Sequence, residues 1–119
     1  MDIIIQRMIS NFQEKSNSKF IGIYNIETQY ELYTIIEKKE LAHSVSTTDC
    51  FNCIERAINI SKSFPLNIIS IEGVNESTLI KFLNTETVLI VTYVPIKSAI
   101  SDTRNFIIKF SMQYSKSDS

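Results

Sequence analysis

The chain has 119 residues, of which 44% are hydrophobic and 21% are charged, and its formal net charge is −1. This composition is typical of a globular domain, and the length allows one domain to bury a core without a metal or disulfides. The basic and acidic residues are interspersed, which argues against a nucleic acid partner, because phosphate binding requires a basic stripe. We predict one domain over residues 1–115 and a flexible tail over residues 116–119.

The chain contains two glycines, Gly22 and Gly73, which lie far apart. Phosphate-cradling loops need closely spaced glycines, so neither a P-loop nor a dinucleotide-binding fingerprint is present. The N-terminal residues become polar too soon for a signal peptide, and the C-terminal residues include no Cys for prenylation. We therefore expect a cytoplasmic protein that does not insert into a membrane.

The first half of the chain predicts a helix, a β-hairpin and a second helix. Apolar residues at three- and four-residue spacing predict a helix over residues 2–15, with one face formed by Ile4, Ile5, Met8, Ile9 and Phe12. Residues 20–26 and 31–37 resemble two strands, joined by a linker short enough for a hairpin. A second helix is expected over residues 49–62, capped by Thr47, Thr48 or Asp49. Its apolar residues extend over most of its circumference, so it has two surfaces to bury.

The second half predicts an antiparallel meander and a last helix. Strands are expected over residues 66–72, 78–83 and 87–94, with short turns between them. The last of these strands is apolar at odd and even positions, which indicates burial on both faces, and it is too short to span a bilayer. After Pro95, Ser98 or Ser101 is expected to cap a helix whose buried row contains Ile100, Ile107, Phe110 and Tyr114, with Phe106 and Ile108 beside it.

This order of elements resembles the Roadblock domain family, which includes Roadblock and dynein light chains, Ragulator scaffold subunits and bacterial and archaeal polarity-GTPase regulators. The resemblance covers residues 2–115 and rests on the order and length of the hairpin, the second helix and the meander. The first hairpin departs from the family pattern, because an acidic-Gly turn is common there and this chain has Glu27-Thr28-Gln29-Tyr30. Longin domains begin directly with the hairpin, so the expected N-terminal helix argues against that relationship.

The resemblance implies an α/β (α+β) sandwich of order α-β-β-α-β-β-β-α. It implies a five-stranded antiparallel sheet with the last strand in the middle, the first and last helices on one face and the second helix on the other. It also implies homodimerisation through the strand at residues 66–72 and the second helix. The sequence supports this dimer, because an edge strand rich in Ile without Lys or Pro aggregates unless it is paired. The predicted interface residues are Cys53, Ala57, Ile60, Ser61, Ile68, Ile69, Ser70 and Ile71.

Few residues suggest chemistry. Cys50 and Cys53 form a C-x-x-C at a helix N-terminus, where a redox role or a zinc site shared across a dimer is conceivable, but their surroundings favour packing. His43 stands alone in a polar loop, and a surface role is favoured over general-base chemistry. Tyr24, Tyr30 and Tyr33 cluster near the first hairpin, where sheet packing is favoured over base stacking. We predict no catalytic residue, no metal and no cofactor.

Three functions follow from these patterns. The first is a non-enzymatic dimeric scaffold or regulator of a Ras-like small GTPase, which the Roadblock resemblance implies. The second is an adaptor subunit of a trafficking or motor complex with a longin-like or profilin-like domain, for which a heteromeric partner would be expected. The third, which the residues favour least, is a small-ligand or redox sensor with a profilin-like or PAS-like fold.

Overall fold

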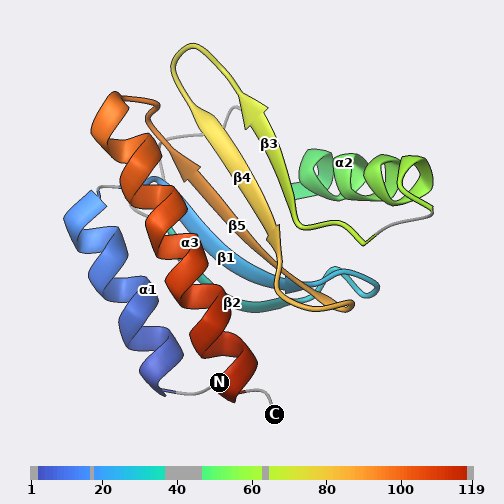
Figure 1. Ribbon diagram of the computed structural model, residues 1–119, viewed down its shortest axis with the longest axis horizontal. Coiled ribbons are helices and arrows are strands. Elements are labelled where there is room, and N and C mark those ends of the chain that lie inside the picture. Colours follow the sequence, from blue (N-terminus) through green and yellow to red (C-terminus); the bar gives the residue numbers. More distant parts are fainter. Residues whose placement is uncertain (1–2, 17, 37–46, 63–64, 118–119) are drawn as a thin grey trace.

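The computed structural model describes residues 3–16, 18–36, 47–62 and 65–117. The elements, in chain order, are α1 (Ile3–Ser16), β1 (Phe20–Asn25), β2 (Glu31–Ile36), α2 (Thr47–Ile60), β3 (Ile68–Glu72), β4 (Ser77–Phe82), β5 (Thr87–Tyr93) and α3 (Lys97–Ser117). The strands form one antiparallel sheet in the order β2-β1-β5-β4-β3, with α1 and α3 side by side on one face and α2 on the other (Figure 1). The predicted α/β class, element order and central last strand are confirmed.

The central strand β5 is buried at all seven of its residues. Its alternating side chains divide between two cores, as the two-residue period of a strand requires. Leu89, Val91 and Tyr93 pack toward α1 and α3, whereas Val88 and Ile90 pack toward α2. The absence of polar alternation in this segment is therefore a direct consequence of the helices on both faces.

The layer of α1 and α3 is anchored by a narrower set of residues than the periodicity predicted. Ile5 and Ile9 of α1 and Ile107 and Phe110 of α3 are fully buried, and the rings of Phe12 and Phe106 stack with centroids 4.1 Å apart. The wider prediction was wrong at Ile4 (49% exposed) and Ile100 (40%). Ile4 is rotated away from the buried row of α1, whereas Ile100 lies in line with Ile107 but in the first turn of α3. Ile108, which was predicted beside the buried row, is 57% exposed.

The first hairpin forms without the glycine turn that is common in such hairpins. Gln29 takes the left-handed conformation that a glycine would usually supply, with φ 61°. Asn25 supports the turn, because its side-chain oxygen accepts a hydrogen bond from the backbone N–H of Thr28 at 2.9 Å. The backbone N–H of Asn25 in turn donates to the carbonyl of Tyr30 at 2.9 Å. Local side-chain hydrogen bonding thus takes the place of an Asn-Gly or Asp-Gly signal.

Gly22 of β1 marks a close approach of two rings on the α2 side of the sheet. Phe20 and Tyr24 flank it along the strand, with ring centroids 6.4 Å apart, and Tyr24 also meets Phe51 of α2 edge-on at 5.7 Å. A Cβ at Gly22 would lie 2.7 Å from the ring of Tyr24 and 2.9 Å from that of Phe20. Because Gly22 has no side chain, the rings of Phe20 and Tyr24 can both pack over it beneath α2.

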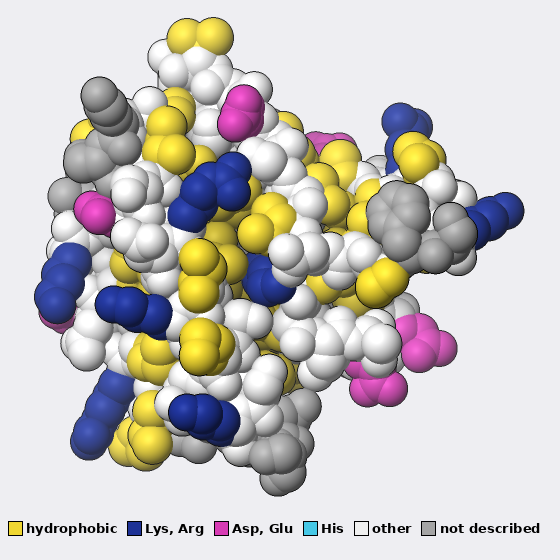
Figure 2. Space-filling model, in the orientation of Figure 1, with side chains coloured by type: hydrophobic (Ala, Val, Ile, Leu, Met, Phe, Trp, Pro, Cys, Tyr) yellow, Lys and Arg dark blue, Asp and Glu magenta, His cyan; other side chains and the backbone are white. Residues whose placement is uncertain are grey.

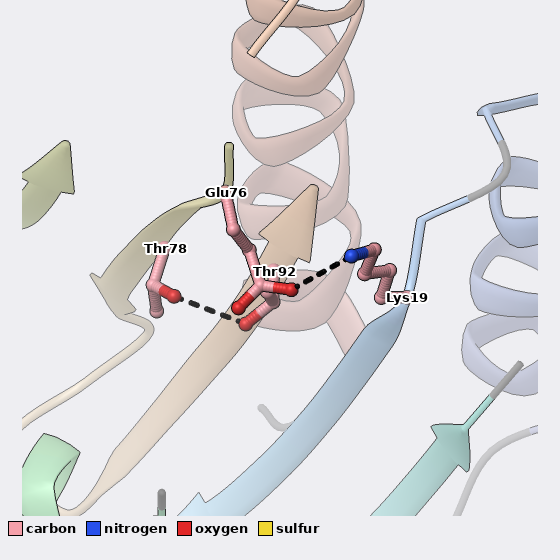
Figure 3. Close-up of polar contacts among 4 residues, drawn as sticks. All are labelled: Lys19, Glu76, Thr78 and Thr92. Carbon is pink, nitrogen blue, oxygen red and sulfur yellow. Dashed lines mark hydrogen bonds and ion pairs between the residues drawn. The ribbon is translucent and has the colours of Figure 1, made fainter. Parts of the chain in front are cut away.

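Polar contacts join β1, β4 and β5 near the C-terminal end of β5 (Figure 3). The hydroxyls of Thr78 and Thr92 lie 3.1 Å apart between β4 and β5, and both residues are buried. Lys19, just before β1, forms an ion pair of 3.2 Å with Glu76, just before β4. Because β5 lies between β1 and β4, this ion pair spans the end of the central strand.

Three helix ends differ from the predicted positions. α3 begins at Lys97, so Ser98 and Ser101 lie inside the helix; the carbonyl of Ile96 accepts from the N–H of Ile100 at 3.1 Å. The same helix extends through Ser117, beyond the predicted start of the tail, and the hydroxyl of Ser115 donates to the carbonyl of Ser111 at 3.1 Å. α2 begins at Thr47, earlier than predicted, and its first turn therefore includes Thr47, Thr48 and Asp49, the three residues predicted as caps.

Candidate dimer interface

β3 lies at one edge of the sheet, where its backbone groups divide between two directions. The N–H of Phe82 donates to the carbonyl of Asn67 at 2.9 Å, and the N–H of Gly73 donates to the carbonyl of Glu76 at 3.0 Å. Alternation in an antiparallel ladder then directs the N–H and C=O groups of odd-numbered β3 residues toward β4. The groups of Ile68, Ser70 and Glu72 point outward, where β3 has no neighbouring strand among the described residues.

The side chains of β3 are only partly covered. Ile69 and Ile71 pack against the core beneath α2, and Ile68 packs against the core beneath α1 and α3. All three remain partly exposed, and Ser70 is exposed. β3 therefore combines half-buried aliphatic side chains on both faces with an open row of backbone hydrogen-bonding groups, which is the form of edge that natural proteins usually protect.

α2 buries one side against the sheet and leaves an apolar flank uncovered. Cys50, Phe51 and Ile54 belong to the core beneath the helix. At 100° per residue, Cys53, Ala57 and Ile60 lie together on one flank, about a quarter-turn from the buried row. Cys53 and Ala57 are half-buried, while Ile60 is 84% exposed.

Ser61 is the one predicted interface residue that the chain itself covers, since it is 6% exposed. It lies on the sheet side of α2, nearer the buried row than the flank of Cys53, Ala57 and Ile60. Ser61 is therefore covered in the single chain, and its place in a dimer interface stays a prediction. The remaining predicted residues all present surface at the β3 edge or on the α2 flank.

Comparison with solved structures gives closely similar folds at very low sequence identity. Myxococcus xanthus MglB matches with a TM-score of 0.66 and 9% identity, covering 96% of this chain and 97% of the other. The gliding protein MglB from Thermus thermophilus gives 0.67 and 6%, covering 91% and 86%. A Roadblock/LC7 domain from Streptomyces avermitilis gives 0.65 and 8%, covering 92% and 93%.

This chain has the Roadblock fold. No family model matches its sequence, and no curated protein matches it either. The agreement therefore lies in the arrangement of helices and strands, which is the feature on which the resemblance in the sequence rested.

A groove of about 630 Å³, which sequence reasoning missed, adjoins the C-terminal end of α2 in this Roadblock fold. It separates the helix from the β4–β5 turn and the segment leading to β3, and its lining includes Ile58, Lys62, Leu66 and Phe82. These residues come from separate segments of the chain, so no local sequence pattern marks the groove. Its described lining combines apolar side chains with the basic Lys62.

The two cysteines of this chain, Cys50 and Cys53, differ in their environment. Cys50 is 2% exposed, and burial raises the pKa of its thiol to about 11, with the charges of Cys53 and Asp49 adding to the effect. A reactive cysteine at a helix N-terminus requires a lowered pKa, so burial has the opposite effect on this thiol. A zinc site shared across a dimer would require Cys50 to leave the core. No group of three or more His, Cys, Asp or Glu residues suited to a metal occurs in the described ranges.

Among the other residues considered for chemistry, the structure describes the side chains of Tyr24 and Tyr30. Tyr24 is buried against Phe51, in agreement with a packing role. Tyr30 is 74% exposed at the hairpin turn. His43 lies outside the described residues, and so does the side chain of Tyr33. The surface of this Roadblock fold that best fits a binding role is the β3 edge together with the α2 flank.

Proposed function

We propose that this protein is a non-enzymatic, homodimeric scaffold or regulator of a Ras-like small GTPase. The proposal is carried by one observation: a Roadblock fold whose β3 edge is open and whose neighbouring helix keeps an uncovered apolar flank. The GTPase partner comes from the resemblance to the Roadblock family, in which such regulators occur. No nucleic acid partner is proposed.

The open edge suits pairing with a second copy of the chain. Antiparallel pairing across a two-fold axis brings the same strand, β3, of both subunits together. The outward backbone groups of β3 are centred on Ser70. In that register Ile68 pairs with Glu72 of the partner subunit, and the two copies of Ser70 pair with each other. The axis then runs perpendicular to the sheet, so both α2 helices lie on one face, where their apolar flanks can meet.

The proposed mechanism is recognition by a rigid composite surface that spans both subunits. A regulator that adds no catalytic group acts by binding one nucleotide state of the GTPase more tightly than the other. A hundred-fold preference corresponds to about 2.7 kcal/mol of differential binding. The paired sheets and helices would supply a surface that neither subunit provides alone.

Binding experiments with the small GTPases of the source organism test this proposal. Isothermal titration calorimetry of each GTPase, loaded with GDP or a non-hydrolysable GTP analogue, should show binding with a preference for one nucleotide. The absence of binding to every one of them would remove the GTPase role. A protein that binds a different Roadblock-fold chain in preference to itself would instead support the adaptor function.

A further inference from the structure

The charges of this protein are divided between its two helical layers. α1 and α3 together contain six basic and two acidic residues, a formal charge of +4. Because the whole chain carries −1, the rest of it carries −5. Figure 2 shows Lys and Arg side chains among hydrophobic ones over α1 and α3. One face of the sheet therefore bears a basic layer on an otherwise acidic protein.

Exposed aliphatic residues concentrate on the same layer. On α3, Ile108 and Met112 are 57% and 61% exposed and follow Arg104 at four-residue spacing, so the three lie along the outward side of the helix. On α1, Ile3 is 61% exposed. Seven of the twelve exposed large hydrophobic residues in the described ranges lie on α1, on α3 or in the segment entering α3.

These aliphatic side chains lie on the ridges of the helices rather than in a cavity. A groove of about 560 Å³ does run between α1 and α3, but its lining includes Met8, Phe12 and Phe106 and neither Ile108 nor Met112. A protein partner would have to supply a concave apolar surface to cover such ridges. The interface of a lipid bilayer accepts protruding aliphatic groups without shape complementarity, and the stems of Arg and Lys can extend so that their charges reach the phosphates.

We infer that the outer face of α1 and α3 binds the surface of an anionic lipid bilayer. Ile108 and Met112 enter the headgroup region, while Arg104 and Lys109 contact lipid phosphates. The contact is peripheral: no helix in the described part of the chain is long and apolar enough to cross a membrane. The inference does not depend on a GTPase.

The proposed dimer would strengthen this contact. A two-fold axis perpendicular to the sheet places both copies of the α1–α3 layer on one side of the assembly, opposite the α2 helices. The two layers then meet the same bilayer, and the second binding event becomes intramolecular. The α2 face stays directed toward the solvent, where a protein partner can reach it.

Flotation with lipid vesicles tests the inference. The full chain should float with phosphatidylcholine vesicles that contain about 30% phosphatidylglycerol and stay at the bottom with pure phosphatidylcholine. Each basic residue near an anionic surface contributes about 1 kcal/mol, so Arg104→Glu should lower the partition coefficient by at least about five-fold. Ile108→Ser should lower it by a similar factor, because about half of that side chain is available for burial.

Matched variants away from this face serve as controls. Lys62→Glu makes the same charge change at the C-terminal end of α2, and Val74→Ser removes an aliphatic side chain that is 95% exposed in the β3–β4 turn. Both should leave flotation unchanged, and circular dichroism should show that all four variants are folded. Failure to float, or an equal loss in the controls, would overturn the inference.

Two further measurements on the same variants distinguish two other binding partners for this face. A lower mass of Ile108→Ser by light scattering would show that the face binds a second copy of the chain, and the lipid inference would fail. Retention on immobilised polyglutamate that Arg104→Glu abolishes, without flotation, would show an acidic protein as the occupant and would also overturn it. Flotation of a chain that binds no GTPase would remove the proposed function alone.

Discussion

Ser70→Pro is the substitution that separates the proposed dimer from the fold of the single chain. The N–H of Ser70 points to the open side of β3, so proline at this position removes no hydrogen bond to β4. Proline is tolerated on an edge strand when its missing N–H would have faced the solvent. We expect a folded monomer, because the same N–H lies at the centre of the proposed pairing between two β3 strands.

The expected size of the effect follows from the two-fold symmetry. Each dimer contains two copies of residue 70, so the substitution removes two donors and leaves two buried carbonyls without partners. At about 1–3 kcal/mol for each unsatisfied group, dimerisation should weaken by about 2–6 kcal/mol. This corresponds to a dissociation constant about 30-fold to 20,000-fold higher.

Sedimentation velocity over a range of concentrations measures this change directly. The parent should sediment at twice the chain mass of 13.7 kDa. Ser70→Ala keeps the backbone donor and should remain a dimer, while Ser70→Pro should sediment as a monomer that circular dichroism shows to be folded. A monomeric parent, or a dimer of unchanged affinity in Ser70→Pro, would refute pairing through the β3 edge.

Four further substitutions test the packing of the single chain, each by urea unfolding. Thr103 is fully buried, and its hydroxyl has no hydrogen-bond partner among the residues that the structure describes. Thr103→Val should therefore raise the free energy of unfolding by about 1 kcal/mol, whereas Thr92→Val, which breaks a hydroxyl pair, should lower it by about 1 kcal/mol. Shifts of the same sign would contradict this. Gly22→Ala should lower it by about 1–3 kcal/mol through overpacking, and a neutral result would show that the rings can move. The folded chain retains the Cys50 proton that the unfolded chain releases near pH 9. The free energy of unfolding should therefore be constant below pH 9 and fall by up to about 3 kcal/mol as the pH rises toward 11, and Cys50→Ala should not show this fall. Equal losses in both proteins would refute the raised pKa.

The sheet was predictable because its patterns are local. The uninterrupted apolar segment of β5 and the two-sided apolar surface of α2 each require a neighbour on both sides, and few arrangements of these elements supply them. The exposure of Ile4 and Ile100 was not predictable in this way. An Ile at helical spacing contributes to a periodic pattern whether it faces the core or the solvent, and only the packing of α1 against α3 decides between them.

The open edge within the candidate interface was predictable to a similar extent. The position of β3 at the edge of the sheet, where the backbone groups of Ile68, Ser70 and Glu72 point outward, follows from strand order. The covered position of Ser61 depends on how far α2 is rotated about its axis, which the breadth of its apolar surface leaves undetermined. The groove beside Leu66 and Phe82 joins segments distant in sequence, so only the folded chain reveals it.

The position of β5 has a consequence for how the chain is made. β5 pairs with both β1 and β4, which do not pair with each other, so without it the strands separate into two isolated hairpins. Phe20 and Thr92, which face each other across the β1–β5 ladder, lie near opposite ends of the sequence. During synthesis, the sheet can therefore close only after its last strand has left the ribosome. Until then the β3 edge and the side of β4 that later pairs with β5 are both open, and a chaperone would be most useful in that interval.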